Sequence, residues 1–290
     1  MSKIKLMTDS ASDIPKDLEA KYDIRILRFP ITLGDKSFYD RDYDYVEYYD
    51  MIINSKDFPT HAQITAYEFE ELYKEYYDEG YTDLIYVAIA SLGSATYSNA
   101  VMAIDMFYEN NPDAKDKYKV HVIDSGNYTG VYGFPLLQAA EKIQHGASAE
   151  DAIAYMQDWL SCAEVHFGCY TLEFVKRSGR VSTAAAFVGE LMGLRPVIKI
   201  KKGISSPEAK VRGDKAIIPK VVEITADRII PQTPYCLVYG YSEELERELA
   251  KELTKKLGYP PEMSFRIGGV IAANAGPKLV GAFFKAKDPD

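Results

Sequence analysis

The chain opens with KIKLMTDSASDIP (residues 3–15), an apolar run of strand length that is followed directly by a polar turn. Apolar runs of similar length recur, each separated from the next by a longer stretch with helical spacing: DIRILRFPIT (23–32), DLIYVAIA (83–90) and YKVHVID (118–124). Such alternation favours a largely parallel sheet with helices on both faces. We therefore predict an N-terminal α/β domain in which each run is one strand.

Two helices of this first half are well marked. One is predicted from Tyr45 to Ile53, and another begins at Thr65. Thr65 and Glu68 have the spacing of a capping box, in which the two side chains bond reciprocally to backbone N–H groups at the helix start.

The second half changes character. A helix ending near Cys162 leads to the strand EVHFGCYT (164–171), and two helices broken at Gly179 follow it. Lys202 and Gly203 separate two apolar runs and predict a hairpin. The segments PYCLVYGYS (234–242), SEELERELAKELTKKLG (242–258) and SFRIGGVIAAN (264–274) predict a final strand, helix and strand. We expect an α/β protein with two domains, 1–160 and 161–290, the second built on a mixed sheet with helices.

Composition excludes several classes of function. The 290 residues are 47% hydrophobic, which is enough to bury a sizeable core. The net charge of −9 and the absence of long Lys/Arg runs argue against a nucleic-acid or anionic-membrane surface. The apolar patch in the first ten residues is far too short for a signal peptide, and no segment has the roughly 20 apolar residues of a membrane span. A cytoplasmic monomer without a membrane span is the expectation.

Three polar turns follow predicted strands, where open α/β sheets bind ligands. They are Thr8 to Asp13, Ala90 to Tyr97, and Asp124 to Gly126. In the first turn, Ser12 or Asp13 can instead cap the next helix. In the second, Ser94 and Thr96 offer hydroxyl donors at a helix N-terminus that favours an anion, and capping is the alternative there too.

Two further segments carry candidate residues. His61 lies in the polar approach to the helix at Thr65, where a solvated loop histidine is the simpler interpretation. Arg180 ends the stretch KRSGR (176–180), whose cations suit a helix C-terminus or can bind a carboxylate or phosphate. The three cysteines and four histidines form no spaced ligand pair, so no zinc site and no cofactor are expected. Glycine-rich nucleotide motifs and the GxSxG motif of hydrolases are absent from the sequence.

Taken together, these segments resemble the DegV family of bacterial lipid-binding proteins over nearly the whole chain. The resemblance rests on eight segments in order: TDSASDIP (8–15), HAQIT (61–65), ASLGSATYSNA (90–100), VIDS (122–125), LEFVKRSGRVS (172–182), GLRPVIKIKKG (193–203), KVRG (210–213) and IAANAGPKLVG (271–281).

The resemblance implies a two-domain protein that buries one long-chain fatty acid between its domains. In the fatty-acid kinase members, such a carrier presents the carboxylate to a kinase and performs no chemistry itself. The residues that match the family's carboxylate site are Ser94, His61, Thr96, Gln63, Arg180 and Asn274. The small residues at 183–194 and the apolar stretch 270–273 are candidates for the tunnel lining or for ordinary core.

Two departures from the family pattern keep alternatives open. His61 stands where a threonine is usual, and Asn274 stands where a histidine is usual. One alternative is a lipid binder that is not coupled to a kinase. Another is an acyl hydrolase in which His61 activates Ser94.

Overall fold

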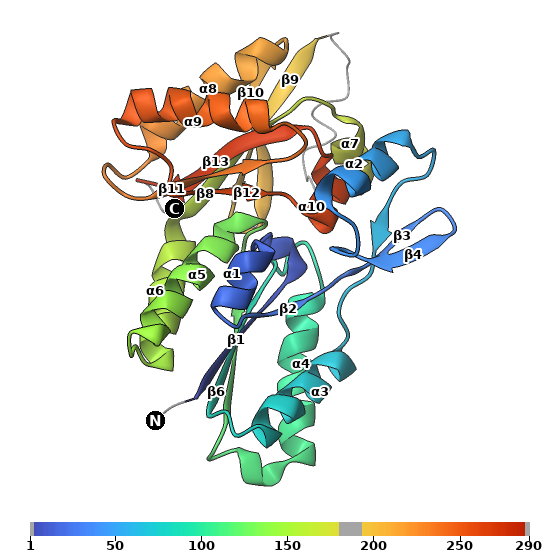
Figure 1. The fold of residues 1–290 in the computed structure, drawn as a ribbon, viewed down its shortest axis with the longest axis vertical. Coiled ribbons are helices and arrows are strands. Elements are labelled where there is room, and N and C mark those ends of the chain that lie inside the picture. Colours follow the sequence, from blue (N-terminus) through green and yellow to red (C-terminus); the bar gives the residue numbers. More distant parts are fainter. Residues whose placement is uncertain (1–2, 180–192, 288–290) are drawn as a thin grey trace.

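The structure is a computed structural model, and it describes residues 3–179 and 193–287 (Figure 1). The first half contains β1 (Ile4–Asp9), α1 (Lys16–Lys21), β2 (Arg25–Leu27), β3 (Pro30–Leu33), β4 (Lys36–Tyr39), α2 (Tyr45–Asn54), β5 (Thr60–His61), α3 (Ala66–Asp78), β6 (Asp83–Ala88), α4 (Thr96–Asn110), β7 (Lys119–Asp124), α5 (Gly130–Gln144) and α6 (Ala149–Cys162). The second half contains β8 (Ala163–Cys169), α7 (Glu173–Ser178), β9 (Leu194–Lys201), β10 (Ile204–Arg212), α8 (Ile217–Arg228), β11 (Tyr235–Tyr239), α9 (Glu243–Leu257), β12 (Met263–Arg266), α10 (Gly269–Ala275) and β13 (Leu279–Lys285).

The first half builds the predicted parallel sheet. Its strand order is β2-β1-β6-β7, and each neighbouring pair runs parallel. Helices α3 and α4 cover one face, whereas α5 and α6 lie on the other (Figure 1). Because all four strands run the same way, their carboxyl ends and the turns that follow them lie at one edge, which faces the second half of the chain.

The second half forms the predicted mixed sheet, of six strands in the order β10-β9-β8-β13-β11-β12. Strand β13 is antiparallel to both β8 and β11. Helices α8 and α9 pack against the outer face, and α5 contacts β8 from the inner side (Figure 1). The inner face of this sheet therefore lies over the carboxyl edge of the first sheet.

Two local predictions are confirmed in detail. Thr65 and Glu68 form the capping box at the start of α3. Lys202 and Gly203 have φ angles of 49° and 77° and connect antiparallel strands β9 and β10. Both positive φ values belong to the tight hairpin turn that the sequence predicts.

The prediction of one strand over residues 23–32 is wrong. The segment divides into β2, in the parallel sheet, and β3, which pairs with β4 and β5 in a separate antiparallel sheet. The division falls at Phe29, whose N–H donates to the Asp40 carboxylate (3.0 Å) and whose carbonyl accepts from the Asp40 N–H (2.9 Å). These bonds turn the backbone away from the parallel ladder.

Two further expectations need correction. The apolar part of SFRIGGVIAAN is helical: the strand ends at Arg266, and α10 begins at Gly269. Neither Ser12 nor Asp13 caps α1, whose N-cap is Pro15 without a side-chain bond. Asp9 instead caps a short 3₁₀ turn over residues 10–12, and the Asp13 carboxylate accepts from the distant Gly268 N–H (2.7 Å).

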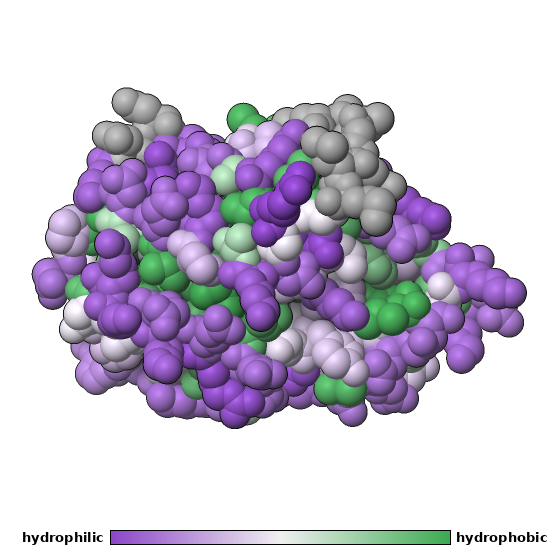
Figure 2. Space-filling model, turned by 90° about the horizontal axis from the view of Figure 1, so that it is seen from above, coloured by the Kyte–Doolittle hydropathy of each residue, from purple (hydrophilic) through white to green (hydrophobic). Residues whose placement is uncertain are grey.

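One cluster of buried side chains connects the two sheets, because it includes strand residues of both halves, such as Leu84 and Phe283. A second cluster lies between the mixed sheet and helices α8 and α9. On the face seen in Figure 2, hydrophobic residues gather in separate patches among hydrophilic ones. None of the described helices has both the length and the apolar character needed to cross a membrane.

Candidate functional site

The three polar turns meet at the carboxyl edge of the parallel sheet. Asp9, which ends β1, accepts a hydrogen bond from the Ile89 N–H after β6 (2.9 Å). Asp124, which ends β7, accepts from the Ser91 N–H (3.0 Å) and the Gly126 N–H (2.9 Å). Carboxylates therefore fix the relative positions of all three turns.

Asp9 is the most heavily bonded of these carboxylates. It is fully buried, and it accepts from the Tyr132 hydroxyl (2.6 Å), the Tyr86 hydroxyl (3.0 Å) and the Ala11 N–H (3.2 Å) in addition to Ile89. Burial raises the pKa of Asp9 to about 6, although these four bonds act in the opposite direction. The loss of hydration therefore outweighs the donors.

Two more buried carboxyls lie behind the turn after β1. Asp40 accepts from the Ser10 hydroxyl (2.7 Å) and the Phe29 N–H (3.0 Å), and burial raises its pKa to about 7. Burial also raises the pKa of Asp13. The Asp13 carboxylate accepts from the N–H of Gly268, the residue that precedes α10. The acidic turn thus connects the first sheet to α10.

The pKa of Asp40 gives a testable dependence of stability on pH. The pKa of an unfolded aspartate is about 3.9, so between pH 4 and 7 the folded chain retains a proton that the unfolded chain has lost. This carboxyl therefore favours folding less as the pH rises through that range. The negative charge of Asp9 raises the pKa of Asp40 further, and the positive charge of Arg41 lowers it.

Asp40→Asn is expected to become more stable relative to the unchanged chain as the pH rises from about 4 to 7, with no further change above that. Urea unfolding of both proteins at several pH values measures the difference. A difference in unfolding free energy that is constant with pH would show that Asp40 titrates normally.

A cavity lies between the two sheets and contains about 760 Å³ not occupied by protein atoms, including the part open to solvent. Its lining comes from β5, the segments after β6, β7 and β12, the mixed sheet and α10: His61, Ile89, Gly93, Tyr128, Thr129, Val165, Phe167, Ile200, Ser205, Val238, Ile267, Val270, Ile271, Asn274, Ala275 and Leu279. Most of these side chains are aliphatic or aromatic, and such a lining suits a hydrocarbon ligand.

Alternation along β8 explains the wall formed by the mixed sheet. Val165 and Phe167 face the cavity, and Ile200 pairs with Val165 on the neighbouring strand. Glu164, which precedes Val165, is buried on the opposite face, where the Arg228 guanidinium of α8 pairs with it (2.7 Å). The sheet therefore keeps its charged residues away from the cavity.

The first sheet closes the cavity through a close approach of two loops. A Cβ atom added to Gly93 would lie 2.4 Å from the Tyr128 hydroxyl oxygen, so a larger residue at position 93 would require the Tyr128 side chain to shift. The next residue, Thr129, has a φ of 54°, which is unusual for a β-branched residue. The strain lies at the cavity wall, where functional sites often store it.

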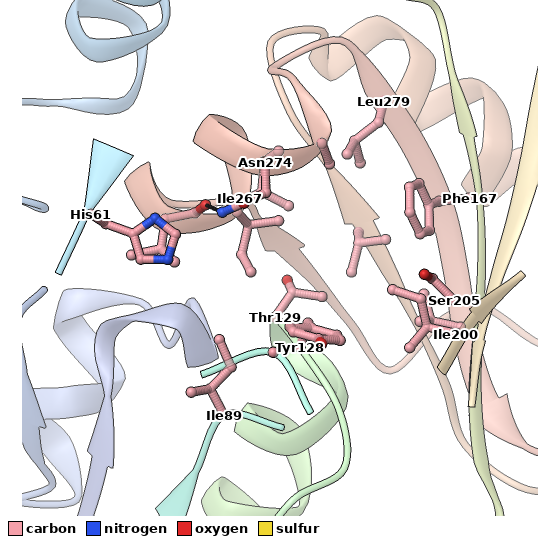
Figure 3. Close-up of a pocket in the computed structure, with 16 residues that line it drawn as sticks. His61, Ile89, Tyr128, Thr129, Phe167, Ile200, Ser205, Ile267, Asn274 and Leu279 are labelled. Carbon is pink, nitrogen blue, oxygen red and sulfur yellow. Dashed lines mark hydrogen bonds between the residues drawn. The ribbon is translucent and has the colours of Figure 1, made fainter. Parts of the chain in front are cut away.

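Two of the sequence candidates lie at the cavity. His61 reaches it from β5 and packs edge-on against Phe29, with ring centroids 6.1 Å apart. Asn274 reaches it from α10, and its amide donates to the Val270 carbonyl (2.7 Å). Figure 3 shows both on one side, opposite Ser205, Ile200 and Phe167.

The other candidates lie elsewhere. Ser94 is next to the lining residue Gly93, and its hydroxyl lies 2.9 Å from that of Thr96, which is buried at the start of α4. Ser94 also accepts from the Thr96 N–H (3.3 Å), so it partly satisfies the helix start. Gln63 is exposed and is not part of the lining, whereas Arg180 lies outside the described residues.

The tunnel-lining expectation can be compared in part. Val270 and Ile271 line the cavity, and Ala272 and Ala273 are buried without lining it. Residues 183–192 lie outside the described residues. Within the described ranges, no three His, Cys, Asp or Glu side chains are grouped as a metal site would require.

Sequence reasoning missed most of the apolar wall. Tyr128 and Thr129 come one residue after the polar turn that follows β7, so their position was a usable signal. The residues from the mixed sheet, such as Phe167 and Ser205, carried no such signal, because an apolar strand does not reveal which of its faces meets a ligand.

Comparison with known proteins agrees with this architecture. The family model described as "Uncharacterised protein, DegV family" matches residues 3–287. A DegV domain-containing protein of Clostridium perfringens is 30% identical over 96% of this chain and 97% of its own length.

Solved structures have the same fold. A stearic acid-binding protein from Eubacterium ventriosum is 25% identical, with a TM-score of 0.85 over 98% of this chain and 97% of its own. A fatty acid-binding DegV family protein from Thermus thermophilus is 27% identical, with a TM-score of 0.84 over 97% and 98%. With a family match over nearly its full length and relatives that share its fold, the chain belongs to the DegV family.

Proposed function

We propose that this protein binds one long-chain fatty acid in the cavity between the two sheets. The observation that carries the proposal is the cavity itself, which is lined mainly by apolar side chains from both sheets and has His61 and Asn274 together on one side. The fatty acid-binding relatives of the same fold support it.

The energetics favour the hydrocarbon tail as the source of affinity. Burying about 15 methylenes at ~0.8 kcal/mol each gives roughly 12 kcal/mol before the cost of association. A hydrogen bond to a charged head group adds about 1.5–3 kcal/mol. The tail therefore supplies most of the affinity, and the head group decides which end of the ligand lies where.

We place the carboxylate beside His61 and Asn274. An asparagine amide has two N–H groups, and the bond to the Val270 carbonyl uses one of them, which leaves the other for a ligand oxygen. Ser94, which is next to the lining residue Gly93, and Thr96, which is bonded to Ser94, are the nearest further candidates. Roles for the exposed Gln63 and for Arg180 stay predictions from the family resemblance. A carboxylate there needs donors rather than a full counter-ion.

The wider role that we propose is that of a carrier. Two domains, 1–160 and 161–290, enclose the acyl chain, and the protein acts as a cytoplasmic monomer that needs no cofactor and catalyses no reaction itself. A partner fatty-acid kinase would phosphorylate the carboxylate that the carrier presents. Mixing the purified protein with such a kinase, ATP and palmitate tests this role. A carrier that couples to the kinase should give acyl-phosphate, whereas a lipid binder that does not couple to it should give none.

Mass spectrometry of lipid extracted from the purified protein tests the binding itself. We expect a co-purifying long-chain fatty acid, or uptake of added palmitate or oleate. A protein that contains no acyl chain and takes up neither acid would overturn the proposal. Covalent labelling of Ser94 by a fluorophosphonate, with turnover of an acyl ester, would instead support the hydrolase alternative.

The Ser94→Ala variant tests the head-group end. If the Ser94 hydroxyl donates to the carboxylate, its loss weakens palmitate binding by about 1–3 kcal/mol, because a buried carboxylate oxygen loses a donor. Hexadecanol has the same tail without the carboxylate, so its binding should change little. Equal affinities of the two proteins for palmitate would remove Ser94 from the site.

A further inference from the structure

A second cavity, with a different set of lining residues, lies between the β4–α2 segment and the start of α10. It contains about 680 Å³ not occupied by protein atoms, including the part open to solvent. Tyr43, Tyr45 and Tyr48 belong to its wall, and Asp40 belongs to it as well. We call it the tyrosine cavity, and the proposed fatty acid site does not involve any of these four residues.

Asp40 is the unusual member of this wall. It is only 1% exposed, and one carboxyl oxygen, Oδ1, accepts both bonds, from Ser10 and Phe29. The other oxygen, Oδ2, is buried and has no hydrogen-bond partner among the described residues. Buried polar atoms are nearly always bonded, so an unpartnered acceptor on a residue that lines a cavity is a candidate partner for a ligand donor.

The cations near the cavity are occupied elsewhere. The Arg41 guanidinium pairs with Glu19 (2.9 Å), and the Lys16 ammonium donates to the Arg41 carbonyl (3.5 Å). Within the described part of the chain, no ion pair is formed by Asp40. The carboxyl consequently titrates near pH 7, with a pKa raised to about 7 by burial.

The other carboxylate that lines the tyrosine cavity, Asp44, already has a hydrogen-bond partner. The Asp44 carboxylate accepts from the Glu47 N–H (2.8 Å) at the start of α2. The chemistry that the cavity leaves open is therefore one buried carboxyl beside aromatic rings. A carboxylate combined with aromatic faces is the combination that binds organic ammonium groups.

We propose that the tyrosine cavity binds a small organic amine in its ammonium form, with the N–H donors on Asp40 Oδ2 and the hydrocarbon part against the tyrosines. The ligand supplies the donor that Oδ2 lacks. A single positive charge on the ligand matches a single carboxylate.

Benzylammonium is a suitable probe, with benzyl alcohol as its neutral analogue and benzoate as its anionic one. In calorimetric titrations of the full chain at pH 7.5, we expect saturable binding of benzylammonium and no binding of the other two at up to about 10 mM. Stronger binding of benzoate would assign the cavity to anions through Lys16 and Arg41 and overturn the proposal. Absence of benzylammonium binding would overturn it as well.

Matched variants locate the site. Asp40→Asn retains an acceptor for Phe29 and Ser10 but replaces the Oδ2 acceptor with a donor, so benzylammonium affinity should fall about tenfold or more. Asp44→Asn removes a rim charge while an asparagine still caps α2, and its affinity should stay within about twofold. Equal losses of benzylammonium affinity in the two variants would show that the probe is attracted only by the general negative charge, and would contradict the proposal.

Two further measurements keep the test decisive. Palmitate affinity should be the same in Asp40→Asn as in the unchanged chain, which separates this site from the proposed fatty acid site. If Asp40→Asn does not fold, Tyr43→Leu removes an aromatic face and should weaken benzylammonium binding alone. Unchanged benzylammonium affinity in Tyr43→Leu would then rule out the tyrosine cavity.

Discussion

Ala275→Trp is expected to bind palmitate about 100-fold more weakly than the unchanged chain. Ala275 lines the cavity at the end of α10, and its small side chain leaves space that an indole would occupy. Excluding about four methylenes from the cavity at ~0.8 kcal/mol each removes roughly 3 kcal/mol, which corresponds to a factor of about 100 or more. Titration with a fluorescent fatty acid and competition by palmitate measure the change.

A matched control separates lost space from damage to the fold. Val46 is 44% exposed on α2 and is not part of the cavity lining, so Val46→Trp adds the same indole outside it. Its palmitate affinity should be unchanged, and both variants should retain a native circular dichroism spectrum. If folded Ala275→Trp bound palmitate within about threefold of the unchanged chain, the acyl chain would have to lie outside this cavity.

Asp9→Ala is expected to lower the free energy of unfolding by about 3–5 kcal/mol. The substitution leaves up to four buried donors without an acceptor, and each unsatisfied group costs about 1–3 kcal/mol, although such costs are not additive. Asp9 also connects the ends of β1 and β6, so part of the cavity floor is expected to loosen. Urea denaturation followed by circular dichroism gives the change in free energy.

The comparison with other substitutions shows whether the loss comes from the buried bonds. Asp9→Asn retains one acceptor oxygen and should lose less than the alanine variant. Asp116 is exposed, so Asp116→Ala should change stability by less than about 0.5 kcal/mol. A loss below about 1 kcal/mol in Asp9→Ala would mean that water or a rearranged chain satisfies these donors.

The parts of the fold that could be predicted are those decided by local chemistry. The reciprocal bonds of Thr65 and Glu68 and the positive φ angles at Lys202 and Gly203 depend on residues adjacent in sequence. Alternation of apolar runs and helices likewise gave the parallel sheet. The parallel strands then brought their polar turns to one edge, where Asp9 and Asp124 connect them.

The errors arose where distant residues decide the backbone. Residues 23–32 look like one strand, but Asp40, 11 positions after Phe29, takes the Phe29 N–H out of the ladder. Asp13 has the character of a helix cap, yet its carboxylate bonds to Gly268, 255 positions away. No pattern within a short window contains these partners.

The candidate site was predictable only on one side. Family resemblance drew attention to His61 and Asn274, and the structure brings both to the cavity. The opposing wall depends on how the mixed sheet is placed over the first, which the sequence of β8 or β10 does not specify. The roles of the six candidate residues in holding a carboxylate stay predictions.

The contact between Gly93 and Tyr128 has a consequence for how this lineage can diverge. Because a Cβ at position 93 would require the Tyr128 side chain to shift, we expect substitutions at the two positions to be coupled. Homologues with alanine or serine at the first position are expected to have a smaller residue at the second, so an alignment of close relatives should show the pair co-varying.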